Sequence, residues 1–175
     1  MTDPETPASN SGRIGVLMTV LAWIVVLGLL SAFFSGWLGK LDNPNQQVRT
    51  QLSADGVREV VLRQNRAGHY VANGIINGQP VTFLLDTGAT IVSVPTSVAG
   101  RLGLKRGVAL RANTANGVIT TYATRLDQVR LGDIELNNVR ADINPGMQGD
   151  EVLLGMSFLR KLEFTQRGRE LTLRQ

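Results

Sequence analysis

The chain has no cysteine and a single histidine among its 175 residues. Without cysteine it forms neither a disulfide framework nor a metal site with thiolate ligands. One imidazole, that of His69, is too few for a histidine-rich zinc site. We therefore expect a protein that works without a metal ion and without a cofactor.

The chain also lacks a concentrated basic region and is poor in aromatic residues, which make up 5% of it. The net charge is +4, but the only adjacent basic pairs are Lys105-Arg106 and Arg160-Lys161. Nucleic-acid binding usually shows a basic patch or stripe, so we expect no nucleic-acid partner. A solvated basic surface explains the charge, and weak attraction to anionic lipid is the lesser alternative.

One long uncharged run stands near the N-terminus, from Ile14 to Phe34. A helix of this length spans about 31 Å, close to the hydrocarbon thickness of a bilayer. A buried soluble helix is the less favoured reading, because no polar face is visible. A cleaved signal peptide is the stronger rival, but its apolar region is usually shorter and ends in a small-x-small site. We predict an uncleaved transmembrane helix over 14–34, with the lipid bilayer as its partner.

Composition divides the rest of the chain. Residues 1–13 are polar and proline-containing, which predicts a disordered tail. Residues 35–55 are rich in Asn, Gln and Gly, which predicts a polar linker. Residues 56–175 form the globular domain. Arg13 before the apolar run and Lys40 and Arg49 after it favour, by charge count, a cytoplasmic domain. A short amino tail is equally the layout of a signal anchor that exports the domain on its C-terminal side.

The globular region consists of short apolar runs broken by turns. Asn77-Gly78, Asn116-Gly117 and Arg167-Gly168 each stand between two such runs, which predicts three hairpins. One short helix is expected from Thr96 to Gly103, and a second after VLLG at 152–155. Strands at this spacing with two short helices predict a compact, mostly-β barrel or sandwich.

One of these runs, TFLLDTGATIVSV at 82–94, holds an aspartate between strand-forming apolar residues. Asp-Thr-Gly alone is a weak signal. Here Ala89-Thr90 and a second strand follow, and VLLG comes about 65 residues later, with the Asn116-Gly117 hairpin between them. The arrangement over Gly68–Phe164 resembles the retropepsin-like aspartic proteases, above all their bacterial membrane-anchored, single-domain members.

The resemblance implies a retropepsin-like barrel of one lobe and roles for particular residues. Asp86 would be catalytic, with Thr87 and Gly88 building its loop and Gly155 packing beneath it. The hairpin at 111–121 would be a flap that closes over a peptide or protein substrate. Substrate-binding positions would be Ala89, Thr90, Thr114, Ala115, Asn116 and Gly117.

An aspartic protease uses two carboxylates that share one proton, because like charges that close do not both ionise. This chain has a single Asp-Thr-Gly. Asp127, Asp133 and Asp142 lack a following Thr-Gly, and we predict that all three are exposed. The second carboxylate would then be Asp86 of another copy, in a homodimer.

The sequence therefore predicts a membrane-anchored aspartic endopeptidase. One alternative is a non-catalytic dimerising or peptide-binding module of the same fold. A third reading is an enzyme that is inactive as a monomer and is switched on by dimerisation. The resemblance further implies a single-pass protein of the bacterial inner membrane with its protease domain in the periplasm.

Overall fold

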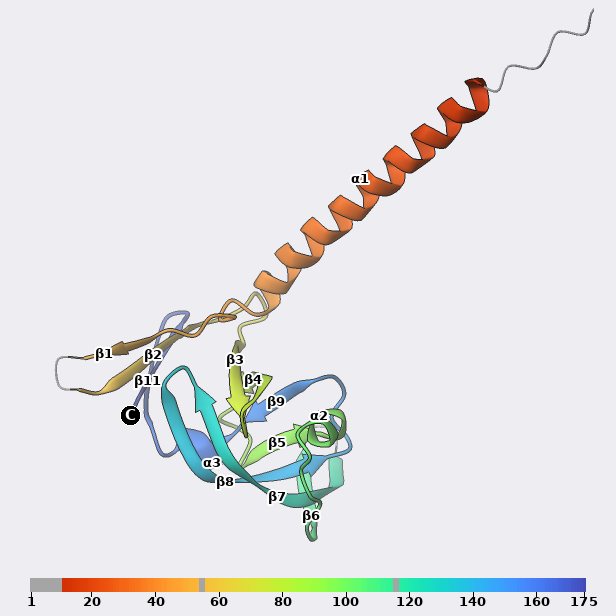
Figure 1. Ribbon diagram of the computed structural model, residues 1–175. Helices are drawn as coiled ribbons and strands as arrows, with labels where there is room; N and C mark the ends of the chain where they lie inside the picture. The colour runs from red at the N-terminus through yellow and green to blue at the C-terminus, as the bar shows by residue number, and fades with distance from the viewer. Residues whose placement is uncertain (1–10, 54–55, 115–116) are drawn as a thin grey trace, which may run out of the picture. The chain divides into compact units, whose positions relative to one another are not determined.

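A computed structural model of the chain describes residues 11–53, 56–114 and 117–175 (Figure 1). The chain divides into two compact units, the first ending at Gly39 and the second spanning Lys40–Gln175. Among the described residues, all the strands belong to the second unit.

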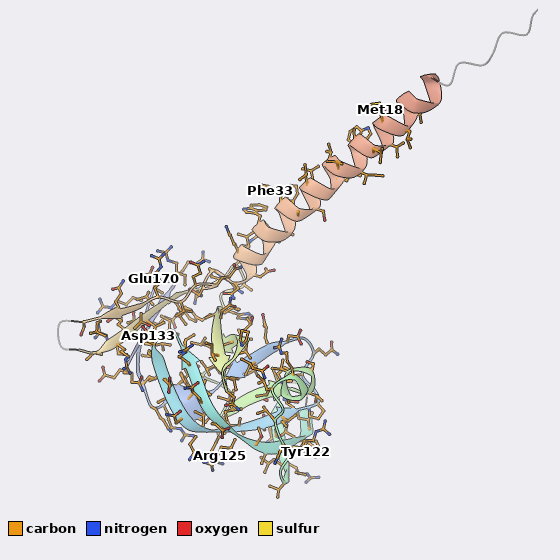
Figure 2. All side chains as sticks on the ribbon, viewed as in Figure 1. Met18, Phe33, Tyr122, Arg125, Asp133 and Glu170 are labelled. Carbon is orange, nitrogen blue, oxygen red and sulfur yellow. The ribbon has the colours of Figure 1, made fainter. Side chains whose placement is uncertain are left out.

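Helix α1, Ser11–Asp42, is longer than the predicted span of 14–34 at both ends. Apolar side chains from Val16 to Phe34 are exposed all around it, and Figure 2 shows Met18 and Phe33 extending from its surface. The segment Gly15–Asp42 has the length and composition of a membrane span, a property that a signal sequence near an N-terminus shares. Crossing of a membrane therefore stays a prediction.

The predicted polar linker of 35–55 includes residues that pack into the second unit. Within the second unit Asn43 and Asn45 are both buried. The Asn45 amide donates to the carbonyl oxygens of Arg63 (2.9 Å) and Val71 (2.7 Å) and accepts from the Arg63 N–H (2.8 Å). These bonds replace water around a segment that is mostly polar, with Val48 as its apolar residue packed against the core, which is why composition alone predicted a solvated chain.

The second unit is built from two sheets. The larger has the strand order β3-β4-β9-β5-β8-β7-β6, and β3 also pairs with β7, so the first six strands close into a ring. Strand β6 extends the sheet beyond the ring. In Figure 1 β7 and β8 curve together along the domain. The bounds are β3 Tyr70–Ile76, β4 Gln79–Leu85, β5 Val92–Pro95, β6 Ala109–Thr114, β7 Gly117–Leu131, β8 Ile134–Asn144 and β9 Glu151–Leu154.

The smaller sheet has the order β1-β2-β11-β10 and is antiparallel throughout. Its inner strands β2 and β11 bury alternate residues in the same apolar core as the ring, whereas every residue of β10 is exposed. Two short helices complete the unit. The bounds are β1 Thr50–Leu52, β2 Arg58–Arg63, α2 Thr96–Arg101, α3 Met156–Leu159, β10 Glu163–Arg167 and β11 Glu170–Arg174.

The predicted mostly-β barrel with two short helices is confirmed, and so are the turns of its first and third hairpins. Asn77 and Gly78 both have positive φ, 49° and 79°, as a type I′ hairpin turn requires. The third hairpin turns at Gly168, with φ of 57°. The tip of the second hairpin, Ala115 and Asn116, lies outside the described residues, but β6 and β7 pair in register up to Thr114 and Gly117.

Candidate active site

The Asp-Thr-Gly loop connects two strands that do not pair with each other. Strand β4 ends at Leu85 and β5 begins at Val92, and β9 lies between them. Strand β9 runs parallel to β4, with Leu154 opposite Leu85, and pairs with β5 where Leu153 faces Ser93. The loop must therefore cross over the end of β9, which fixes its position in the fold.

Hydrogen bonds hold the loop in a tight turn around Asp86. The Gly88 N–H donates to Asp86 Oδ1 at 2.8 Å, and the Ala89 N–H donates to the Asp86 carbonyl at 3.3 Å. The Asp86 N–H donates to the Leu154 carbonyl of β9 at 3.3 Å. Asp86 is half-buried, while Thr87 and Gly88 are exposed. The turn thus presents one carboxylate at the surface in a fixed orientation.

Two glycines allow this close packing. A Cβ on Gly88 would stand 3.1 Å from Asp86 Oδ1 and crowd the carboxylate. A Cβ on Gly155, directly after β9, would collide with the carbonyl oxygen of Ile91 and lie 2.7 Å from that of Ala89. Gly155 therefore packs beneath the loop, as the family resemblance implies.

The residues after Gly155 bind the loop from below. The Met156 N–H donates to the Ala89 carbonyl at 2.8 Å. The buried Ser157 hydroxyl accepts from the Val92 N–H at 3.0 Å and donates to the Arg140 carbonyl of β8 at 2.7 Å. Sequence reasoning missed Ser157, because a serine in a short helix carries no signal of a partner 65 residues away.

Beside the loop lies a cavity of about 440 Å³, here called the loop cavity. Loop residues Gly88, Ala89 and Thr90 line one side of it, and the β6 arm of the predicted flap lines another. It therefore brings together the predicted positions Ala89 and Thr90. Strand β6 contributes Leu110, Arg111, Ala112 and Asn113, which lie nearer the base of the hairpin than the predicted substrate-binding residues at its tip.

One prediction about the acidic residues is wrong. Asp127 and Asp133 are exposed as expected, but Asp142 is buried and lines the loop cavity. Its strand is covered on both faces, by the core on one side and by the flap arm and loop around the cavity on the other. At Asp142, the alternation of apolar and polar residues along β8 therefore does not indicate which side chains are exposed. The remaining cavity residues that sequence reasoning missed are Ile91, Ser93, Thr121, Arg140, Asn144 and Leu153.

Known proteins resemble this chain in sequence and in fold. Residues 72–161 match the family model described as "gag-polyprotein putative aspartyl protease". An uncharacterised Sinorhizobium protein from the region 5' of cobV is 31% identical over 170 residues, which cover 90% of this chain and 73% of that protein. The uncharacterised protein RP867 of Rickettsia prowazekii is 29% identical over 110 residues, and this chain spans 47% of its length.

The crystal structure of a retropepsin-like aspartic protease from Rickettsia conorii superposes with a TM-score of 0.57 and 26% identity. The superposition covers 73% of this chain and 94% of that structure. The match to the family model covers the loop, the flap hairpin and β9, which are the elements that build the candidate site. The chain thus belongs to the gag-polyprotein aspartyl protease family, and its domain has the retropepsin-like fold.

Proposed function

We propose that the protein is an aspartic endopeptidase that acts as a homodimer and is anchored to the membrane by α1. The observation that carries the proposal is the Asp86 turn, which holds one carboxylate at the surface by the Gly88 N–H and opens beside the loop cavity. The family and the fold support the same activity.

Catalysis requires a second carboxylate. The sequence holds one Asp-Thr-Gly, so the partner would be Asp86 of a second copy related by a twofold axis. The pair would share one proton. The ionised group would take a proton from a bound water, whose oxygen attacks the scissile carbonyl carbon, while the protonated group donates to the carbonyl oxygen. As the tetrahedral intermediate collapses, the proton taken from water would pass to the leaving nitrogen, so that the C–N bond breaks with release of a neutral amine and a carboxylic acid.

Replacement of Asp86 by Asn tests the chemistry. We expect the full chain in detergent micelles to cleave members of a peptide library and Asp86→Asn to lose this activity by at least about a thousandfold, because the amide is not a general base. Asp133→Asn, the same change at an exposed turn, is the matched control. Full activity in Asp86→Asn would refute the catalytic role.

Mixing tests the shared site. If each site needs Asp86 from both chains, an excess of Asp86→Asn will titrate wild-type chains into inactive heterodimers, and activity will fall well below that of the wild-type chain alone. Activity will also rise more steeply than linearly with chain concentration below the dimer dissociation constant. Linear dependence and indifference to Asp86→Asn would refute the dimeric site.

A binding module without catalysis is the second candidate, and the half-buried Asp86 with its Gly88 hydrogen bond is compatible with it. A statine-type transition-state analogue separates the two, since an enzyme site binds such a compound much more tightly than substrate. The intact mass of the membrane-bound protein tests the anchor against a cleaved signal sequence. A reporter fused to Gln175 that is active on one side of the membrane tests the predicted periplasmic location.

A further inference from the structure

The floor of the loop cavity carries polar side chains that the proposed chemistry does not use. Along β8, Arg140, Asp142 and Asn144 occupy alternate positions and line the cavity, while Ala141 and Ile143 between them belong to the core. Asp142 is only 4% exposed. Its Oδ1 atom is buried and has no hydrogen-bond partner among the described residues.

A second unpaired group lies beside it. Thr121 of β7 is fully buried, lines the same cavity, and has an Oγ1 without a hydrogen bond in the described part of the chain. Asp142 faces Ala123 in the β7–β8 register, so Thr121, two residues before Ala123, is its diagonal neighbour on the same face. Diagonal neighbours lie within reach of a single long side chain that enters between them.

Buried polar groups in native proteins are almost always paired, and a buried carboxylate needs a donor. We propose that the loop cavity is a specificity subsite for a lysine side chain of the peptide substrate, with Asp142 recognising the ammonium group. The proposal rests on the proposed function, because it assigns a substrate class to the same site.

The residues that line the cavity fit a lysine side chain. Ile91, Leu110 and Leu153 provide apolar walls for a four-carbon stem. An ammonium has three donors, and the floor offers Asp142 Oδ1 and Thr121 Oγ1 as acceptors. In the sheet, Asp142 is flanked by the small residues Ser93 and Ala123, which leave room above the carboxylate.

Two arginines, Arg111 and Arg140, also line the cavity, and both are exposed. Neither is the missing partner, since Asp142 Oδ1 stays unpaired in their presence. Because both arginines are exposed, their charges are solvated and screened, whereas the buried carboxylate is desolvated and attracts an opposite charge more strongly. Among the described charged residues that line the cavity, only Asp142 is buried, and its charge favours a cation.

The test compares substrates that differ in one group. A peptide cleaved by the full chain is prepared with lysine or norleucine, in turn, at each of the two positions on either side of the scissile bond. We expect one position at which lysine raises kcat/KM at least tenfold over norleucine. In Asp142→Leu the preference should fall to unity or reverse, while Asp133→Asn should keep it. Figure 2 shows Asp133 at the β7–β8 turn, at the far end of these strands from Tyr122.

Asp142→Asn keeps the shape of the side chain and removes its charge, so it tests the proposal even if Asp142→Leu does not fold. We expect it to lose most of the lysine preference with an unfolding midpoint no lower than that of wild type, because an unpaired buried carboxylate adds no stability. Equal cleavage of both peptides by wild type, a preference for glutamine or glutamate over lysine, or an unchanged lysine preference in both Asp142 variants would overturn the proposal.

If no peptide is cleaved, the proposed activity fails, and the subsite is tested separately by binding. Statine-containing peptides with lysine or norleucine beside the statine are titrated against the full-length Asp86→Asn chain. At least tenfold tighter binding of the lysine peptide that disappears in Asp86→Asn with Asp142→Asn supports the subsite without catalysis. Equal binding, or lysine-dependent binding that survives the Asp142 change, overturns it.

Discussion

Gly155→Ala is the sharpest test of how the candidate active-site loop is supported. The Gly155 φ of −86° is one that alanine adopts freely, so the substitution adds only a methyl group. That methyl would collide with the Ile91 carbonyl oxygen and lie 2.7 Å from the Ala89 carbonyl oxygen. Both atoms are backbone and belong to the loop, so relief requires the loop itself to move away from β9.

Two effects of the added methyl group lower the free energy of unfolding. Forcing a methyl group into packed backbone costs about 1–3 kcal/mol. Moving the Ala89 carbonyl also weakens the 2.8 Å bond from the Met156 N–H, at about 0.5–1.5 kcal/mol. We therefore expect the free energy of unfolding to fall by about 2–4 kcal/mol. At a urea m-value of about 2 kcal/mol per molar, the midpoint should fall by roughly 1–2 M.

Pulse proteolysis of the full chain across a urea series measures this midpoint. Gly100→Ala is the matched control, because Gly100 lies in α2 with nothing within 4 Å of an added Cβ, and alanine there should be neutral or favourable by up to about 1 kcal/mol. Peptidase activity of Gly155→Ala should fall even under conditions where the domain stays folded, since the loop moves. A midpoint within about 0.3 M of wild type would refute the close approach.

Two further substitutions probe buried hydrogen bonds. Asn45→Ala should lower the free energy of unfolding by about 1–3 kcal/mol, because the Arg63 N–H and the Val71 carbonyl lose their partner. The control Gln47→Ala, at an exposed residue, should change the free energy of unfolding by less than about 0.5 kcal/mol. Equal urea midpoints for the two variants would contradict the importance of the Asn45 bonds. Ser157→Ala should cost a similar 1–3 kcal/mol or so by leaving the Val92 N–H unpaired. Ser97→Ala is its control, because the Ser97 hydroxyl bonds exposed partners, the Gly149 carbonyl and the Asp150 carboxylate, and its loss should cost less than about 0.5 kcal/mol. Equal losses of stability in the two variants would contradict the importance of the buried Ser157 bond.

The parts of the fold that sequence predicts well are set by local chemistry. Asn77-Gly78 forms the expected turn because Asn and Gly tolerate the positive φ that the turn requires. The strands on either side of Asp-Thr-Gly are expected from their apolar residues, and the tight turn at Asp86 is what the family resemblance implies; in the structure the loop connects β4 to β5. Both features depend on residues that are neighbours in the chain.

The parts that sequence misses depend on distant segments. The sequence around Asn45 is typical of a linker, but the hydrogen-bond partners of Asn45 on β2 and β3 lie 18 and 26 residues away. The alternating pattern around Asp142 predicts an exposed charge. Its burial results from the flap arm and the Asp-Thr-Gly loop, which lie on the outer face of β8 and are encoded at other places in the chain.

Strand β8 contacts both the support of the Asp-Thr-Gly loop and the loop cavity. The carbonyl of Arg140 accepts from Ser157, whose hydroxyl in turn holds the Val92 N–H at the end of the loop. Two residues further along, Asp142 pairs with Ser93 of β5, the strand that the loop enters. Strand β8 therefore contributes both to the support of the first residue after the loop and to the lining of the cavity. If a larger substrate side chain displaced β8, we expect the Ser157 bonds to Arg140 and Val92 to weaken. A side chain that pairs with Asp142 without displacing β8 would leave these bonds intact.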